Sequence, residues 1–288
     1  MDTLDTIERG MQPQVDSDSQ VLGMWLHGTS PHTEKAYRHD VEQFLEFAGV
    51  GLRQVTLSML QAYSDSIAHL ADTSRSRKLS AVKSALSFAH RMGYTRFNVG
   101  AVLRGPKVKN RLAERILSEA DVQKIIALET SPRNRVLLTL LYASGGRVSE
   151  VCALKWKDAQ DRTDGGQVTL FGKGGKTRAV LLSQSTWKAL QSIRGEGHPD
   201  SAVFPSRIRH GHLDASQVHR IVNAAARRAG IEGNVSPHWF RHAHASHALD
   251  RGCPIHLVQA TLGHASVATT GKYVHARPTE SSAKYLAV

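Results

Sequence analysis

Apolar residues recur every three to four positions along most of the chain, which predicts a largely helical protein. In the first third this pattern extends from about Ser19 to Val102. Its clearest segment follows Ser30, a residue type that caps helices, and it has Pro31 in its first turn and Gly49 at its end. Further helices are expected at 57–70 and 74–92.

The second half of the chain contains one segment with a different period. Residues 167–183 alternate between apolar and polar side chains around Gly172, Gly174 and Gly175, which predicts a β-hairpin with a glycine-rich turn. A helix capped by Ser118 precedes it. Other helices are expected at 132–144, from about 147, and at 185–193, 214–229, 237–249, 254–262 and 267–273. The pattern therefore predicts a mainly α fold with a small β-sheet.

A domain boundary is predicted at the sequence RGPKVKNRLAER, which combines Gly105 and Pro106 with basic residues and lacks apolar periodicity. We expect an acidic, flexible N-terminus, a helical domain, this basic linker, and a second domain with a C-terminal tail, at 1–17, 18–103, 104–115 and 116–288.

Composition and charge narrow the choice of partner. The chain has 288 residues, 41% of them hydrophobic, which is enough for a sizeable core in one large or two ordinary domains. Its net charge of +12 favours a nucleic acid, although a merely basic protein or one that touches anionic membranes would share it. Nine basic residues are candidate DNA contacts, with solvated surface as the alternative: Arg75, Arg77, Lys78, Lys83, Lys107, Lys109, Arg111, Lys176 and Arg178.

The sequence contains no apolar run of membrane-spanning length, and its acidic N-terminus lacks the features of a signal peptide. The two cysteines, Cys152 and Cys253, give no disulfide framework, and Cys152 lies in an apolar run where it is expected to be buried. These features favour a reducing cytoplasm, in association with the nucleoid.

Candidate chemistry lies near the C-terminus, in SPHWFRHAHASH and LGHASVATTGKYVH. His238 and Arg241 are three residues apart, His264 follows Arg241 by 23 residues, and Tyr273 lies nine residues further on. A hydroxyl nucleophile, a cation and two imidazoles are the groups needed to attack a phosphodiester and hold its charge. Taken singly, each of these residues is more often found in a structural role.

A metal site is the main alternative for the histidines, because His238/His242 and His244/His247 have helical ligand spacings. No carboxylate or thiol completes such a cluster, and Arg241 would repel a cation. We therefore expect neither a metal nor another cofactor. Of these histidines we expect His238 to be functional, and the other three to be structural.

Two further candidates lie upstream. Arg147 follows two glycines at the start of a helix, where its guanidinium and the helix amides suit an anion. Glu150 could orient it, although a surface ion pair is the simpler interpretation. Lys173, on the hairpin turn, could give a proton to a leaving oxygen. The sequence GGKT at this turn is not a nucleotide-binding loop, because Leu170 stands where that motif needs a glycine.

Together these residues resemble the tyrosine recombinases, or phage integrase family. The motifs that carry the resemblance are SGGRVSEVCALKW, LFGKGGKTRAVLL, HWFRH, LGH and TTGKYVH. The segment SPHTEKAYRHDVEQFLEFAG resembles the family's SAM-like core-binding domain. The resemblance is closest to Xer-type recombinases and compact integrases. It implies a helical core-binding domain and an α+β catalytic domain that form a C-shaped clamp on DNA.

By this resemblance, Tyr273 attacks the scissile phosphate and forms a 3′-phosphotyrosyl link. Arg147 and Arg241 bind the non-bridging oxygens and stabilise the pentavalent transition state. Lys173 is the general acid for the 5′-oxygen. These cations replace the divalent metals of other phosphoryl-transfer enzymes.

The resemblance also implies supporting roles. His264 hydrogen-bonds the phosphate, His238 assists proton transfer to and from Tyr273, and Glu150 occupies the family's acidic supporting position. The expected partners are double-stranded DNA with a specific recombination site and further copies of the chain. We expect a homo-tetramer on two sites and a monomer in free solution, with an accessory protein as a further candidate partner. The tail ESSAKYLAV is expected to dock on a neighbouring subunit.

The function implied is site-specific recombination, serving integration, excision or resolution. A type IB topoisomerase would share the chemistry but only relax supercoils, and the compact helical N-terminal domain argues against it. A DNA-binding protein that has lost catalysis is the other alternative. The complete set of reacting groups argues against that alternative.

Overall fold

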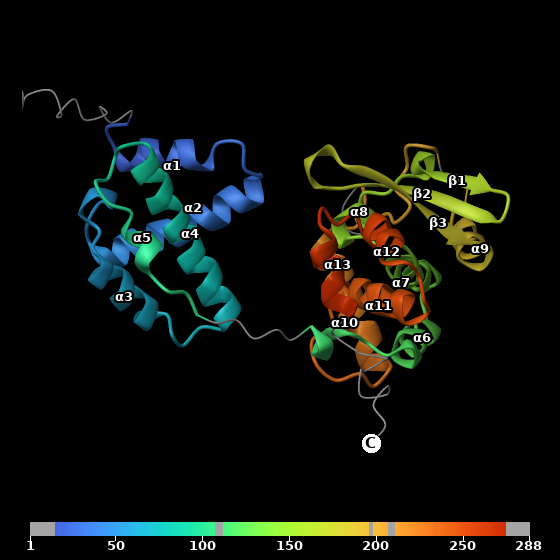
Figure 1. Cartoon of the computed structure of the whole chain (residues 1–288). Coiled ribbons are helices and arrows are strands. Elements are labelled where there is room, and N and C mark those ends of the chain that lie inside the picture. The colour runs from blue at the N-terminus through green and yellow to red at the C-terminus, as the bar shows by residue number, and fades with distance from the viewer. Residues whose placement is uncertain (1–14, 107–111, 196–197, 207–210, 275–288) are drawn as a thin grey trace, which may run out of the picture. The chain divides into compact units, whose positions relative to one another are not determined.

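The computed structural model describes residues 15–106, 112–195, 198–206 and 211–274. It divides the chain into two compact units, Met1–Lys109 and Asn110–Val288, each with its own hydrophobic core (Figure 1). The division falls inside the segment 104–115, where the sequence lacks apolar periodicity. The candidate DNA contacts Lys107, Lys109 and Arg111 lie outside the described residues.

The first unit is helical over its described residues, with helices α1 (Asp18–Leu26), α2 (Pro31–Ala48), α3 (Leu57–Ser66), α4 (Asp72–Arg91) and α5 (Val99–Val102). The bounds predicted for α2 are confirmed. The Ser30 hydroxyl accepts a hydrogen bond from the Thr33 amide, and Gly49 caps the other end. The long helices α2 and α4 pack together and bury Phe44 and Leu79.

In the second unit, helices pack against a small sheet, whose first strand is largely exposed. These helices are α6 (Glu119–Ala127), α7 (Pro132–Ser144), α8 (Val148–Cys152), α9 (Gln184–Gln191), α10 (Ala215–Arg228), α11 (Pro237–Asp250), α12 (Ile255–Leu262) and α13 (Val267–Val274). At the start of α6 the side chains of Ser118 and Asp121 each accept a hydrogen bond from the other residue's amide, so the predicted cap is confirmed.

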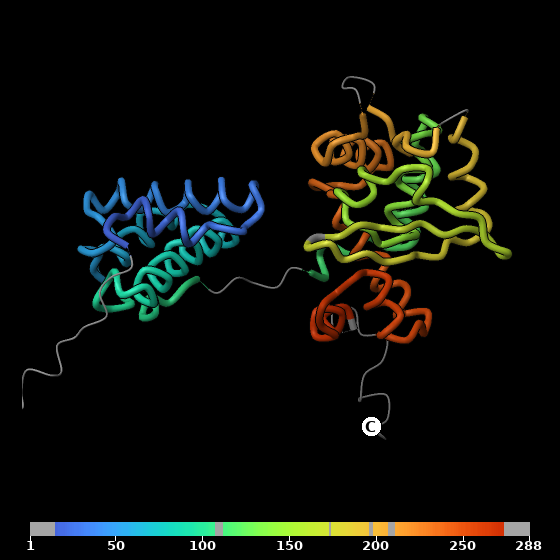
Figure 2. The backbone as a smooth tube through the Cα atoms, turned by 90° about the horizontal axis from the view of Figure 1, so that it is seen from above, coloured from blue at the N-terminus to red at the C-terminus, as the bar shows by residue number. Residues whose placement is uncertain are grey.

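The sheet is antiparallel, in the order β1 (Ala159–Arg162), β2 (Gly165–Phe171), β3 (Thr177–Ser183). Its strands lie side by side, and the hairpin of β2 and β3 runs out to a glycine-rich turn (Figure 2). The hairpin prediction is confirmed, but β1 was missed. Its sequence AQDR is polar and largely exposed, so it contains no alternation to detect.

The core of the second unit forms around α7. Leu137, Leu138 and Leu141 of this helix are almost fully buried, together with Phe240 of α11. Cys152 is also buried, as predicted, and burial raises the pKa of its thiol to about 11. The mainly α fold with a small sheet is therefore confirmed, and α11 lies between the core and the short helices α12 and α13.

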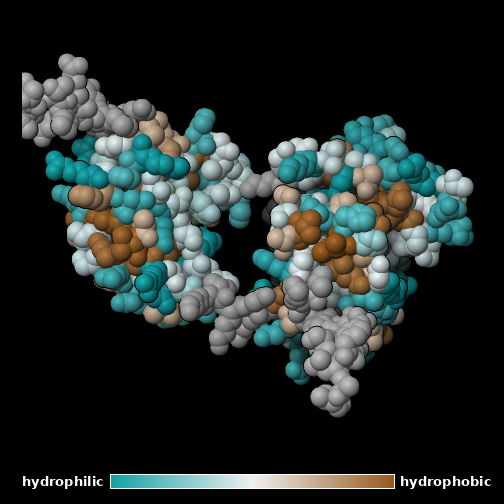
Figure 3. Space-filling view, in the orientation of Figure 1, coloured by the Kyte–Doolittle hydropathy of each residue, from teal (hydrophilic) through white to brown (hydrophobic). Residues whose placement is uncertain are grey.

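On the face shown in Figure 3, both units are mostly hydrophilic, with apolar residues in limited patches. Exposed apolar side chains include Phe47 and Phe97 in the first unit and Phe171 and Leu181 in the second. Among the described helices, none is both long and apolar enough to cross a membrane.

Candidate active site

Arg241 lies in the interior of the second unit, where the ends of two helices meet. Its Nη1 donates to the Gly145 carbonyl at 2.6 Å, and its Nη2 donates to the Leu262 carbonyl at 2.7 Å. These carbonyls belong to the C-terminal ends of α7 and α12, where helix dipoles favour a cation. Burial, followed by the charges of Arg147 and Arg178, lowers the pKa of Arg241 to about 10, so the guanidinium is still charged at neutral pH.

Two glycines allow this arrangement. Gly145 and Gly263 end α7 and α12 with φ of 56° and 64°, in the left-handed region that side chains disfavour. A Cβ at Gly145 would also lie 2.7 Å from Leu262 Cδ2. A side chain at position 145 would therefore force these neighbours to shift, and glycine lets the helix ends approach this closely.

Glu150 holds two other arginines in place. Its side chain is 2% exposed, and its carboxylate accepts bonds from the Arg147 amide at 2.8 Å and from Arg147 Nη1 at 2.9 Å. Arg178 donates to both oxygens of the same carboxylate, at 3.0 and 2.7 Å. Burial opposes ionisation, but these donors more than offset it and lower the pKa of Glu150.

The predicted pair of Arg147 and Glu150 is thus confirmed, but it is not a surface pair. Arg147 keeps 38% of its side chain exposed, whereas Arg178 keeps 11%. Arg178 also donates through Nε to the Thr261 carbonyl at 2.6 Å. The site therefore contains three guanidiniums and one carboxylate, so its net charge is positive. A positive charge favours the binding of a phosphate group.

The hairpin turn comes close to the same carboxylate. A Cβ at Gly172 would lie 3.1 Å from Glu150 Oε1, which places the residue before Lys173 beside the Arg147–Glu150 pair. The turn closes with a bond from the Gly172 amide to the Lys176 carbonyl at 2.7 Å. The Lys173 side chain lies outside what the structure describes.

His264 follows the left-handed Gly263 directly, which turns the chain out of α12. Its Nδ1 is 2.9 Å from the Thr270 hydroxyl. Burial and then the charges of Arg241, Arg147 and Arg178 lower its pKa to about 4, so the imidazole is neutral at pH 7. His264 is therefore electrostatically coupled to all three arginines.

Tyr273 lies in α13 and is 6% exposed, in a small cluster with Ile116, Val258 and Leu262. Its ring is parallel to that of His264 within 4°, with centroids 6.4 Å apart. Burial raises the pKa of its hydroxyl, although Arg241 counteracts this. The candidate nucleophile is thus held in the same region as the arginines, as the sequence predicts.

The imidazole that meets the Tyr273 hydroxyl is one that we expected to be structural. His242 Nδ1 is 2.8 Å from Tyr273 Oη. His238, one turn earlier on α11, is exposed, and its ring centroid lies 6.3 Å from that of His242. The signal that could have identified His242 is its spacing of four residues from His238, which puts both on one face of a helix.

The remaining histidines of α11 have structural contacts, as expected. His244 Nδ1 is 2.8 Å from the Tyr142 carbonyl, and His247 Nδ1 is 2.9 Å from the Tyr142 hydroxyl. In the parts of the chain that the structure describes, no group of three or more His, Cys, Asp or Glu residues is placed to hold a metal ion.

The candidate DNA contacts of the first unit lie along α4, and several of them bind to the protein itself. Arg77 and Lys78 both pair with Asp40, which is fully buried. Lys83 donates to a backbone carbonyl, and Arg75 donates to the Ser64 hydroxyl at 2.9 Å. Arg77 keeps 45% of its side chain exposed, against 13% for Lys78. Whether these residues contact DNA stays a prediction.

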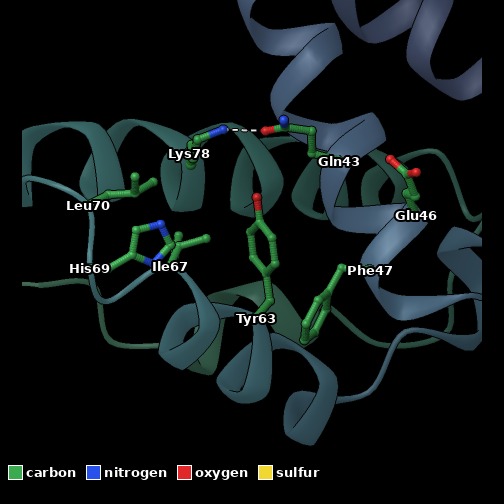
Figure 4. A pocket seen from close by; sticks show the side chains of 8 residues that line it. All are labelled: Gln43, Glu46, Phe47, Tyr63, Ile67, His69, Leu70 and Lys78. Atoms are coloured by element: carbon green, nitrogen blue, oxygen red, sulfur yellow. Dashed lines mark hydrogen bonds between the residues drawn. The ribbon is translucent and has the colours of Figure 1, made fainter.

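Lys78 also lines a pocket of about 480 Å³ in the first unit. Its amine donates to Gln43 at one rim, and Phe47, Tyr63 and Ile67 supply apolar walls (Figure 4). This pocket contains none of the residues predicted to be catalytic.

Comparison with known proteins agrees with the sequence motifs. The model of the phage integrase family matches residues 114–280, and that of the family's N-terminal SAM-like domain matches residues 25–93. Tyrosine recombinase XerC of Thermodesulfovibrio yellowstonii is 32% identical over 264 residues, which cover 86% of this chain and 87% of that relative.

Two crystal structures of lambda integrase share the fold. A dimer bound to a COC′ core site has a TM-score of 0.74 at 20% identity, and the match covers 92% of this chain and 95% of that one. A tetramer bound to a Holliday junction has a TM-score of 0.73 at 21% identity, with 93% and 80% covered.

The lowered pKa values of two histidines predict that the second unit loses stability in mild acid. The pKa values of His242 and His264 are about 4 in the folded state, against 6.5 ordinarily, so the unfolded chain binds more protons between these values. Stability is therefore full above pH 6.5 and falls as the pH drops towards 4. We expect the thermal midpoint of the second unit to fall by about 5 °C between pH 7 and pH 5.

Tryptophan fluorescence during thermal unfolding measures this midpoint. His242→Asn should weaken the pH dependence, whereas His256→Asn, at an exposed position, should leave it unchanged. A midpoint that is the same at pH 7 and pH 5 would contradict the assignment of neutral, half-buried imidazoles.

Proposed function

This chain belongs to the phage integrase family and is a tyrosine-type site-specific recombinase, and we propose that its second unit cleaves and rejoins DNA through Tyr273. The observation that carries the proposal is the convergence of three guanidiniums, two of them bound to one buried carboxylate, with Tyr273 and the two imidazoles next to it. Such a site can hold a phosphate and stabilise the charge that develops on it. The proposed catalytic residues are Arg147, Lys173, His238, Arg241, His264 and Tyr273, with Glu150 in support.

Cleavage exchanges one phosphodiester for another. Tyr273 Oη gives its proton to an imidazole of the site and attacks phosphorus. The bond from phosphorus to the 5′-oxygen breaks, and Lys173 gives that oxygen its proton. Arg147 and Arg241 bind the non-bridging oxygens as charge builds on them. Arg241 uses two of its five N–H donors on carbonyls, so donors remain for phosphate. Rejoining is the reverse step, in which a 5′-hydroxyl displaces Tyr273, and it needs no cofactor.

The proposed partner is double-stranded DNA that carries a specific recombination site. Lambda integrase, which shares the fold, has been crystallised as a dimer on a core site and as a tetramer on a Holliday junction. We therefore propose a homo-tetramer on two sites that forms from monomers, and action at the nucleoid in the cytoplasm. The first unit would be the core-binding domain, and its exposed Arg77 is a candidate phosphate contact.

A nicked suicide substrate tests the chemistry directly. Wild-type protein is expected to accumulate a covalent protein–DNA adduct on a cognate site, and Tyr273→Phe is expected to form none, because it lacks only the nucleophilic oxygen. Denaturing gel electrophoresis measures the adduct. An adduct with Tyr273→Phe, or none with wild type on any cognate site, would contradict the proposal. Exchange of strands between two sites then separates a recombinase from an enzyme that only relaxes supercoils.

Two cations of strand β3 and its turn are expected to differ in role. Arg178 binds Glu150 and Thr261 inside the protein, whereas Lys176 is exposed. Arg178→Gln should slow single-turnover cleavage by about tenfold or more at saturating DNA, because Glu150 and Arg147 lose their alignment. Lys176→Gln should instead weaken DNA binding and reduce the slope of log K against log salt by about one.

Fluorescence anisotropy at several salt concentrations measures the affinity for DNA and its salt slope. Quenched-flow experiments measure the single-turnover cleavage rate. If Arg178→Gln reduced the salt slope as Lys176→Gln does and left the rate at saturating DNA intact, Arg178 would be a DNA contact and not an internal support.

A further inference from the structure

The contact between His242 and Tyr273 has no role in the chemistry described so far. His242 Nδ1 lies 2.8 Å from the hydroxyl oxygen that attacks phosphorus, within ordinary hydrogen-bonding distance. Their ring centroids are 5.6 Å apart. A group in direct contact with the reacting atom is in the right place to exchange its proton.

Packing holds this pair together. Helix α13, which carries Tyr273, packs on both α11 and α12. The Tyr273 ring is buried with Ala245 of α11 and Leu262 of α12, so its hydroxyl end is fixed against the α11 face that carries His242. The backbone of α11 thus sets the position of Nδ1, and the apolar cluster sets the position of Oη.

We propose that His242 accepts the Tyr273 proton during strand cleavage and returns it during rejoining. This inference rests on the proposed function, in which Tyr273 is the nucleophile. In the resting pair the Tyr273 hydroxyl donates to Nδ1, and the ring carries its own proton on Nε2. As the bond from Oη to phosphorus forms, the phenolic proton moves to Nδ1, and the bond from phosphorus to the 5′-oxygen breaks with the proton from Lys173.

The charges around His242 make this proton transfer depend on DNA. The pKa of His242 is lowered to about 4, chiefly by burial. Nearby positive or protonatable groups lower it further, namely His238, Arg241, Arg115 and His264. They come from α11, from the segment before α6 and from the segment after α12. A scissile phosphate bound among the arginines brings negative charge to the same region, so it raises the pKa of His242. His242 is then a weak base without DNA and a stronger one with it.

This role differs from the one that resemblance gives to His238. His238 is exposed, and its ring stacks on that of His242 with 6.3 Å between centroids. The contact of His238 is thus with His242, and His242 in turn contacts Tyr273. His238 is therefore better placed to contact the phosphate or to relay a proton to solvent. His242 is the imidazole in contact with the nucleophile itself.

His242→Asn separates proton acceptance from mere contact. The Asn carbonyl can stand near the place of Nδ1 and accept a hydrogen bond, but it does not take up a proton at neutral pH. With a suicide substrate, we expect single-turnover cleavage by this variant to be slower by about 100-fold or more. On an intact site, where cleavage is reversible, rejoining should slow by the same factor, because the group that accepts the proton in cleavage donates it in rejoining. The equilibrium fraction of covalent adduct on that site should not change. The exposed His256→Asn is the matched control and should cleave like wild type.

A cleavage rate for His242→Asn within twofold of wild type would overturn the inference. So would faster cleavage with a larger covalent fraction, which would show that His242 restrains the tyrosine. Both outcomes leave the proposed function intact, since it fails only if wild type forms no adduct or Tyr273→Phe still forms one.

A second measurement does not depend on the folding of the variant. NMR titration of labelled His242 in Tyr273→Phe protein, which cannot react, should show a rise in the pKa of at least one unit when cognate DNA is bound. An unchanged or lower pKa in the complex would contradict the coupling to DNA.

Discussion

The buried carboxylate of Glu150 is the interaction on which the rest of the site depends. Arg147 and Arg178 lie close enough to Arg241 to lower its pKa, which means that the three guanidiniums repel one another. Glu150 offsets this repulsion with four accepted hydrogen bonds, and the ends of α7 and α12 offset it with two carbonyls. One carboxylate neutralises only part of the charge of the three guanidiniums, and a bound phosphate group would neutralise more of it.

The same residual charge governs the histidines. His242 and His264 are both neutral at pH 7, because burial and the neighbouring cations disfavour their charged forms. Neutral imidazoles can accept protons, which protonated ones cannot. An anion that binds among the arginines therefore has two effects. It compensates their positive charge, and it raises the pKa of His242 next to Tyr273. Substrate binding and activation of the nucleophile become linked through charge alone.

Much of this could be predicted from the sequence, because local signals specify local structure. Ser30 and Gly49 set the ends of α2, and the apolar periodicity located the helices on either side of the hairpin. The family motifs predict Tyr273 and Arg241 as site residues, and the structure brings them into one region. What could not be predicted depends on contacts between distant segments. The pairing of Arg178 with Glu150 joins positions 28 apart, and that of His242 with Tyr273 joins positions 31 apart. The spacing of residues along the chain does not predict either of these two contacts.

The role of Glu150 can be measured directly from the free energy of unfolding of the second unit in Glu150→Gln protein, followed by tryptophan fluorescence in denaturant. Glu119→Gln, which breaks a more exposed pair with Arg251, is the control. If one carboxylate offsets the repulsion of the arginines, Glu150→Gln should cost about 2 kcal/mol or more at low salt. Added phosphate should recover part of the loss by binding where the charge is uncompensated. A free energy of unfolding equal to that of wild type, with no response to phosphate, would contradict the account.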